Sequence, residues 1–195
     1  MIETPLLNGL RVMLHQFTII EKEAWQDLVQ RLEIFEYQKG DTIKKFNSEV
    51  TDLHFVMQGI ARHYFIDENN EELTMWFSEI GDLSTDYAAF TKGATTIYEI
   101  KAITAMVCYS ISRDDLNELY DKYKSFERVG RLINQHYLNG FIDRNMFLVK
   151  YSAKQKFDAL YKEKPHFFNE IPLKYIASYL GITVETLSRL RSNTY

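Results

Sequence analysis

The segment from Ile171 to Ser192 carries two short helical patterns that meet at one glycine. Gly181 stands where a helix commonly ends in a left-handed residue, so the first helix is expected to stop there. A pair of short helices joined in this way predicts a helix-turn-helix. The apolar face of the first helix consists of Leu173, Ile176, Ala177 and Leu180.

The second helix of the pair has a capping residue and two distinct faces. Thr183 is a good N-cap, because its hydroxyl can accept a free N–H group of the first turn. Ile182 is expected to fill the turn, and Leu187 and Leu190 form the stripe expected to be buried. The opposite face carries Val184, Glu185, Ser188, Arg189 and Arg191.

This polar face fits the major groove of DNA. Arg189 can pair with guanine, and Glu185 can accept a hydrogen bond from cytosine. Lys174 in the first helix and Arg191 in the second are expected to meet phosphates. The structural alternative is an ordinary helical hairpin with a solvated charged face. The functional alternative is a ligand-binding jelly-roll protein whose C-terminal helices bind another protein.

The charges are divided unevenly along the chain. Residues 1–124 hold 12 Lys and Arg against 21 Asp and Glu, whereas residues 125–195 hold 11 against 6. The net charge of −4 therefore hides a positive C-terminal part. A positive segment around the predicted helix-turn-helix favours double-stranded DNA as its partner.

Composition and motifs exclude several other classes. The single cysteine, Cys108, excludes an internal disulfide. The chain has neither a signal-peptide pattern nor an apolar run that could span a membrane, so a cytoplasmic location is expected. His54 and His63 could face each other across a hairpin, but they lack metal-ligand spacing. Because phosphate loops and nucleophile motifs are also lacking, we expect neither an enzyme nor a metal or cofactor.

The middle of the chain has the sequence pattern of a β protein. Short β-rich runs are separated by turn signals at roughly even spacing, which predicts a small antiparallel barrel or jelly roll. The clearest predicted strands span residues 53–57, 61–66, 73–77, 97–100 and 106–111. Helices are predicted over residues 21–32, 112–123, 125–150 and 152–161. The expected fold class is therefore α+β.

The long helix predicted over residues 125–150 has more apolar surface than one contact requires. One apolar strip is expected to cover the barrel: Leu132, Leu138, Phe141, Ile142, Leu148 and Val149. A second strip lies near heptad spacing and is expected to pair with a second copy of the chain, where Gly140 allows close approach. That dimer strip comprises Phe126, Val129, Ile133, His136, Gly140 and Phe147. The alternative is that both strips are buried within one chain.

The order of these elements resembles the Crp-Fnr family of bacterial transcription regulators. Its most specific piece is the run Gly181-Ile-Thr-Val-Glu-Thr-Leu-Ser-Arg189, which is similar to the recognition helix of the Fnr branch. The cyclic-AMP receptor branch typically has Arg in place of Val184 and Gly in place of Ser188. The longer segment from Lys174 to Arg189 also looks like the short family members of Bacteroidetes-type bacteria.

The resemblance implies a division of labour along the chain. Residues 1–124 would form a cyclic-nucleotide-binding-like jelly roll that acts as the sensor, residues 125–151 a dimerisation helix, and residues 152–195 the DNA-binding domain. Glu185 and Arg189 would read a half-site core that contains a G·C pair, and Ser188 would discriminate at a thymine. The protein would be a homodimer with an unidentified effector or none, and RNA polymerase would be a candidate partner.

The chain departs from the family's phosphate-binding cassette. Family members that bind cyclic nucleotides have Gly-Glu-Leu, followed some ten residues later by Arg-Ser or Arg-Thr and Ala. Here Thr96 stands where that Arg would be, and Thr supplies neither its charge nor its bidentate contact. Cyclic AMP is therefore not the expected ligand. The candidate ligand residues are Gly81, Asp82, Leu83, Ser84, Thr95 and Thr96.

Two further family features are not expected here. The cysteine cluster of oxygen-sensing Fnr proteins is absent from the sequence. Many members also place a β-hairpin wing after the recognition helix, and the four residues after Arg191 are too few to form one.

Overall fold

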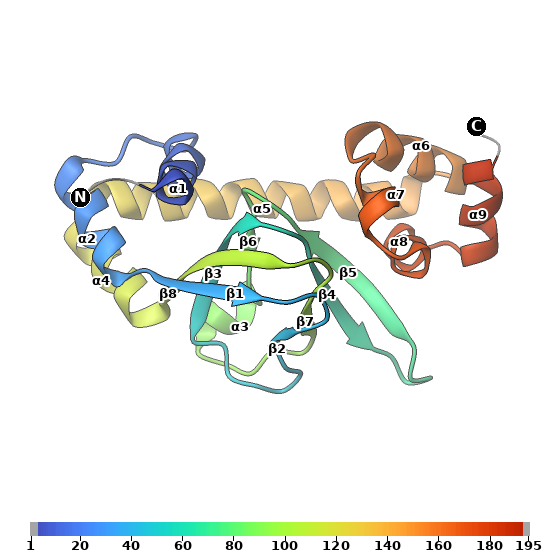
Figure 1. Cartoon of the computed structure of the whole chain (residues 1–195), viewed down its shortest axis with the longest axis horizontal. Coiled ribbons are helices and arrows are strands. Elements are labelled where there is room, and N and C mark those ends of the chain that lie inside the picture. Colours follow the sequence, from blue (N-terminus) through green and yellow to red (C-terminus); the bar gives the residue numbers. More distant parts are fainter. Residues whose placement is uncertain (1–3, 193–195) are drawn as a thin grey trace.

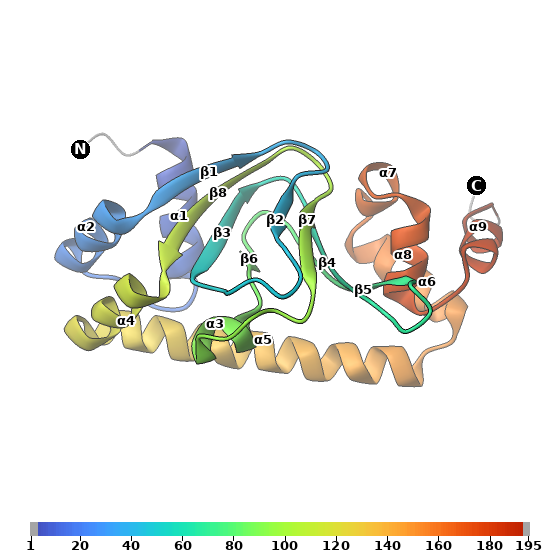
Figure 2. The same cartoon turned by 90° about the horizontal axis from the view of Figure 1, so that it is seen from below.

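A computed structural model describes residues 4–192. A β-roll lies alongside one long helix, and a group of short helices stands at the C-terminal end of that helix (Figures 1 and 2). The helices are α1 (Pro5–His15), α2 (Lys22–Arg31), α3 (Tyr87–Lys92), α4 (Arg113–Lys122), α5 (Lys124–Lys150), α6 (Ala153–Glu163), α7 (Phe167–Glu170), α8 (Leu173–Leu180) and α9 (Val184–Ser192). Within the described residues, no helix is long and apolar enough to cross a membrane.

The roll consists of two antiparallel sheets of four strands each. The first sheet has the order β1-β8-β3-β6 and the second the order β2-β7-β4-β5. This arrangement confirms the predicted α+β jelly roll. The strands are β1 (Glu33–Tyr37), β2 (Thr42–Lys44), β3 (Asp52–Gln58), β4 (Ala61–Ile66), β5 (Glu72–Ser78), β6 (Leu83–Ser84), β7 (Glu99–Ala102) and β8 (Met106–Ser112).

Strand β3 is buried on both of its faces. Val56 points between the two sheets, where Cys108 and Ile100 are also fully or almost fully buried. Phe55 lies on the outer face of the sheet, in a cluster that includes Trp25 of α2 and Leu119 of α4. Because helices cover this outer face, β3 carries buried apolar residues on both faces, with only the buried His54 among them.

Helix α5 turns a different face to the roll from the one the sequence predicted. Phe126, Val129 and Ile133 are 2%, 4% and 7% exposed, inside the cluster that joins α5 to α4 and the roll. The prediction that these three residues form a dimer strip is therefore wrong. The physical reason is that α4 and the roll both pack on this side of the first turns of α5.

The strip predicted to cover the barrel is largely exposed instead. Leu138, Ile142 and Val149 are 61%, 53% and 87% exposed, whereas Leu132 and Leu148 are half-buried. Phe141 is 45% exposed, but its ring meets that of Trp76 on β5 with the centroids 5.7 Å apart, in agreement with the prediction for this one residue. The remaining members of the predicted dimer strip have mixed environments. His136 is exposed, a Cβ at Gly140 would meet only open space, and Phe147 packs beside the cluster of the C-terminal helices.

Candidate nucleic-acid interface and ligand cassette

The C-terminal helices form the predicted helix-turn-helix. Gly181 ends α8 with a φ of 63°, and the N–H group of Ile182 donates to the carbonyl oxygen of Ala177 at 3.0 Å. Thr183 starts α9 by accepting the N–H of Thr186 on its hydroxyl at 3.2 Å. These contacts satisfy backbone groups that the two helix ends leave free. The buried positions of the pair are Ile176, Ala177, Leu180 and Leu187, and Leu173, Ile182 and Leu190 are half-buried.

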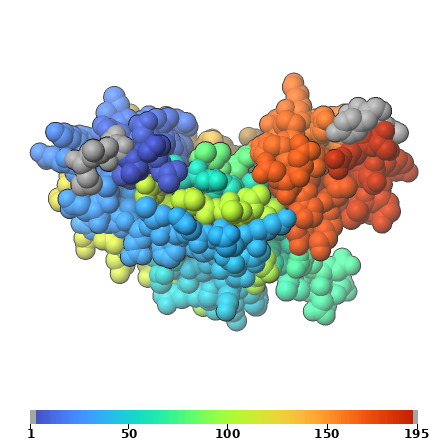
Figure 3. All heavy atoms as spheres, viewed as in Figure 1, coloured from blue at the N-terminus to red at the C-terminus, as the bar shows by residue number. Residues whose placement is uncertain are grey.

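The predicted reading face of α9 is open to solvent. Val184, Glu185, Ser188 and Arg189 are exposed, together with Thr183 at the start of the helix and Lys174 on α8; Arg191 is half-buried. Hydrogen bonds from the backbone N–H of Glu185 and from the Thr183 side chain lower the pKa of Glu185. Helix α9 forms the outer end of the C-terminal lobe, away from the roll (Figure 3).

The first half of the candidate cassette, Gly81 to Ser84, makes its hydrogen bonds within the roll. Gly81 has a φ of 88°, and the carboxyl group of Asp82 accepts the N–H of Glu79 at 3.0 Å. Burial raises the pKa of Asp82. Leu83 and Ser84 form β6, which pairs with Phe55 and His54 of β3. The four residues therefore build a strand and its preceding turn.

The second half of the cassette brings Thr96 to a residue that the sequence analysis missed. The Thr96 side chain is fully buried, and its hydroxyl lies 2.9 Å from Oδ2 of Asp86 and 2.8 Å from the carbonyl oxygen of Tyr98. The other carboxylate oxygen of Asp86 accepts the N–H of Ala89 and so caps α3. Thr95 is exposed and bridges Glu49.

The two histidines of the roll lie in different sheets and not across one hairpin. His54 lies on β3 and hydrogen-bonds the Tyr37 hydroxyl at 2.7 Å, whereas His63 lies on β4 of the other sheet and contacts the Ser78 hydroxyl at 3.0 Å. Burial lowers the pKa of each histidine to about 4. Residues 4–192 contain no cluster of three or more side chains able to hold a metal ion.

The helix-turn-helix unit, defined here as α6 to α9, shares an apolar cluster with the roll. Ile60, Phe77 and Ile103 of the roll belong to the same buried cluster as the apolar residues of the unit. The Phe77 ring lies 5.5 Å from that of Phe167 and 5.2 Å from that of Tyr179. The unit is therefore packed against the sheet that contains β5.

A buried arginine reinforces this contact. Arg62 of β4 is only 2% exposed, and its guanidinium lies 3.7 Å from the ring centroid of Tyr175 on α8. Its Nε donates to the Thr74 hydroxyl at 2.9 Å, and the backbone N–H of Thr74 donates to Ser178 of α8 at 2.8 Å. An ion pair with the Glu72 carboxylate, ring stacking and these hydrogen bonds together offset the cost of burying the charge of Arg62.

Comparisons with known proteins agree with this architecture. Residues 34–123 match the cyclic nucleotide-binding domain family. The fumarate and nitrate reduction regulatory protein of Yersinia pestis is 28% identical over 188 residues, which cover 89% of this chain and 73% of the relative. Both matches are consistent with a Crp-Fnr family transcription regulator.

Solved structures show the same fold at low sequence identity. FixK2 from Bradyrhizobium japonicum has a TM-score of 0.72 and 19% identity, and the match covers 83% of each chain. CLP, described as a c-di-GMP responsive global regulator of Xanthomonas campestris, has a TM-score of 0.65 and 12% identity over 89% of this chain and 91% of that chain.

The candidate cassette places a carboxyl group beside Thr96. Asp86 accepts hydrogen bonds from an N–H group and a hydroxyl, which is the bonding pattern of a carboxylate. A phosphate diester at this position would meet a negative charge, and Thr96 brings no positive charge to offset it. The sequence signal for Asp86 was its place as N-cap before the short run Tyr87–Lys92.

Cyclic AMP is expected not to bind at this cassette. Titration calorimetry should give no saturable heat with the wild-type protein, and a submicromolar dissociation constant would contradict this. Thr96→Arg alone is not expected to create a phosphate site, because the nearby Asp86 carboxylate would pair with the new guanidinium. The same titration on that variant tests this expectation.

Proposed function

We propose that this chain is a sequence-specific DNA-binding transcription regulator of the Crp-Fnr family that reads the major groove with α9. The observation that carries the proposal is the division of α9 into two faces: Leu187 is fully buried, whereas Glu185, Ser188 and Arg189 are exposed. Glu185 and Arg189 are four residues apart and so share one face of the helix. They are suited to read neighbouring base pairs, and Ser188 lies between them.

Charge and position support the same assignment for the residues around α9. Lys174 of α8 is exposed, with its Nζ 4.9 Å from the ring centroid of Tyr175. Arg191 follows the reading residues by half a helical turn. Both side chains are suited to phosphate contacts, which fix the orientation of a protein on the duplex without reading sequence.

We further propose that two copies of the chain pair through the exposed row of α5. Regulators of this family bind DNA and typically act as dimers. The row contains Leu138, Ile142, Met146 and Val149, each between 53% and 87% exposed. Spacings of four, four and three positions place these residues on one face of the helix. A second copy would cover an apolar patch that is unusual on a monomer.

The test of the proposed function begins with selection of a binding sequence. Genomic fragments that the purified protein retains are sequenced, and the enriched site is then measured against a scrambled duplex. A palindromic site with half-sites about one helical turn apart is expected for a dimer. Equal binding to the enriched and scrambled duplexes would contradict the proposal and favour a protein partner for the C-terminal helices.

The two kinds of DNA contact should respond differently to substitution. Arg189→Ala is expected to cost about 1–3 kcal/mol at the selected site and to relax the base preference at one position. Lys174→Ala is expected to weaken binding to all sequences and to reduce the slope of log K against log salt by about one. Fluorescence anisotropy at several salt concentrations measures both effects. If the two variants lose specific and nonspecific binding by equal factors, α9 is not the reading helix.

A further inference from the structure

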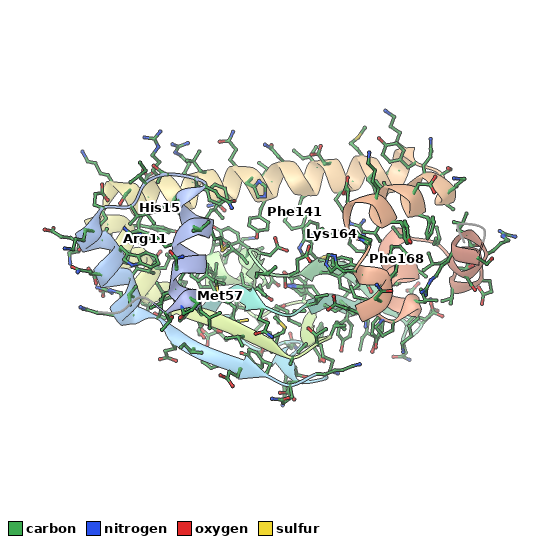
Figure 4. The ribbon with its side chains drawn as sticks, turned by 45° about the horizontal axis from the view of Figure 1, so that its top comes forward. Arg11, His15, Met57, Phe141, Lys164 and Phe168 are labelled. Atoms are coloured by element: carbon green, nitrogen blue, oxygen red, sulfur yellow. The ribbon has the colours of Figure 1, made fainter. Side chains whose placement is uncertain are left out.

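The turn between β5 and β6 holds the helix-turn-helix unit through one carboxylate. Glu79 bonds the Nε2 of His166 at 2.6 Å through Oε2 and pairs with the ammonium of Lys164 through Oε1. Lys164 and His166 lie in the connection from α6 to α7. Lys164 lies on the side of the unit that faces the roll (Figure 4). The side chain of Glu79 is 16% exposed, whereas those of Lys164 and His166 are 36% and 42% exposed, so the contact is partly shielded from water.

The backbone around Glu79 is fixed to the roll. The N–H of Gly81 donates to the carbonyl oxygen of Val56 at 2.9 Å. The N–H of Val56 donates to the carbonyl oxygen of Asp82, also at 2.9 Å. The Asp82 carboxyl group accepts the N–H of Glu79 at 3.0 Å. Glu79 therefore projects from an anchored turn and not from a free loop.

The same turn is also tied to α5. The N–H of Leu83 donates to the hydroxyl of Tyr137 on α5 at 2.7 Å. A second contact links α5 to the helix-turn-helix unit directly, because Arg144 donates to the carbonyl oxygen of Tyr179 and stacks on its ring at 3.5 Å. The turn from Glu79 to Leu83 is thus the place where the cassette, α5 and the helix-turn-helix unit meet.

The contact leaves the proposed reading face free. The unit meets the roll through the α6–α7 connection and through Tyr175 and Ser178 of α8. Glu185 and Arg189 of α9 stay exposed. Because the contact also fixes α9 relative to α5, it sets the separation of two α9 helices in a dimer that pairs through α5.

We propose that Glu79 is a positioning residue for DNA reading. Its hydrogen bond to His166 and its ion pair with Lys164 fix the helix-turn-helix unit on the roll, and so keep α9 in the orientation that binds a half-site. The inference rests on the proposed function. Without this contact the helix-turn-helix unit would move relative to the roll. It would then lose that freedom on binding DNA, and this entropy cost weakens the affinity.

The test reverses the ion pair and then restores it. Three variants are compared with wild type: Glu79→Lys, Lys164→Glu and the double variant, which keeps the net charge of the wild type. Affinity for the selected site is measured by fluorescence anisotropy. Coupling between two sites commonly amounts to about 5–150-fold in affinity, and Glu79→Lys is expected to lose affinity in that range. The double variant is expected to recover most of it, which a merely destabilised protein would not do.

Spin-label distances report the position of the unit independently of DNA. Labels are placed on cysteines introduced at Glu36 of β1 and Lys162 of α6, both exposed, in protein diluted with unlabelled copies. Cys108 is fully buried, and burial raises the pKa of its thiol to about 12, so it is not expected to react. The distance distribution should broaden in Glu79→Lys and narrow again in the double variant.

The matched control is Glu68→Lys, the same charge change on the exposed tip of the β4–β5 hairpin. It is expected to leave both the affinity and the distance distribution as in wild type. The inference is overturned if Glu79→Lys behaves like this control, if it binds DNA more tightly, or if the double variant restores neither measurement. If the wild type selects no DNA sequence, the proposed function fails. The spin-label distance distribution of Glu79→Lys, compared with that of wild type, still decides whether Glu79 holds the unit.

Discussion

Replacing Ile142 by glutamate is expected to give a folded monomer that binds the selected DNA site at least 100-fold more weakly than wild type. Ile142 is 53% exposed in one copy, so the substitution leaves the core of the protomer intact. In the proposed dimer it would place two carboxylates in an apolar seam without partners. A single copy then contacts one half-site, and loss of the second linked contact commonly costs 10²–10⁴ in avidity.

Sedimentation velocity and fluorescence anisotropy on the same samples test this prediction. Asp143→Lys is the control, because Asp143 is also exposed on α5 but lies about 100° around the helix from Ile142. It should remain dimeric and bind DNA normally. A dimeric Ile142→Glu protein with wild-type affinity would exclude this row as the dimer contact.

Ile133→Glu, nine residues earlier on α5, is expected to unfold the protomer instead of only separating the dimer. Ile133 is 7% exposed and lies in the cluster that joins α5 to the roll. Ile133→Glu would bury a carboxylate without a partner, which costs several kcal/mol. This is a large fraction of the about 5–15 kcal/mol that stabilises a typical domain. We therefore expect loss of cooperative unfolding, or a much lower urea midpoint.

Urea titration followed by circular dichroism measures this effect, with Ile133→Val as the conservative comparison. That change removes one methyl group and should cost about 0.5–1.5 kcal/mol. A fully stable Ile133→Glu monomer would mean that Ile133 belongs to the dimer seam after all, as heptad spacing alone suggested.

Local sequence signals were sufficient for the helix-turn-helix and for most of the roll. Gly181 and Thr183 end one helix and begin the next through interactions within a few residues, so the sequence contains the whole signal. Helix α1 also carries such a local signal, because Thr4 caps it and Pro5 stands in its first turn. The strand predicted over 97–100 is found at Glu99–Ala102, because Thr96 and Tyr98 join the hydrogen-bond network of the cassette.

The orientation of α5 could not be predicted in the same way. Both of its strips are apolar, and periodicity alone cannot tell which strip a partner covers. The choice depends on Leu116 and Leu119 of α4 and on the roll, which reach the first turns of α5 from elsewhere in the chain. Arg62 illustrates the same limit, since Tyr175 is 113 positions away and a charged residue in a strand normally predicts solvent exposure.

The apolar cluster shared by the roll and the helix-turn-helix unit limits how far this protein can be divided or recombined. Ile60, Phe77 and Ile103 complete a core whose other members come from α6 to α9, so these helices cut away from the roll would expose that core to water. An engineer who grafts this unit onto another regulator would have to rebuild the face of the sheet on which it rests. Exchange of single residues on α9 is therefore the simpler route to a new DNA specificity.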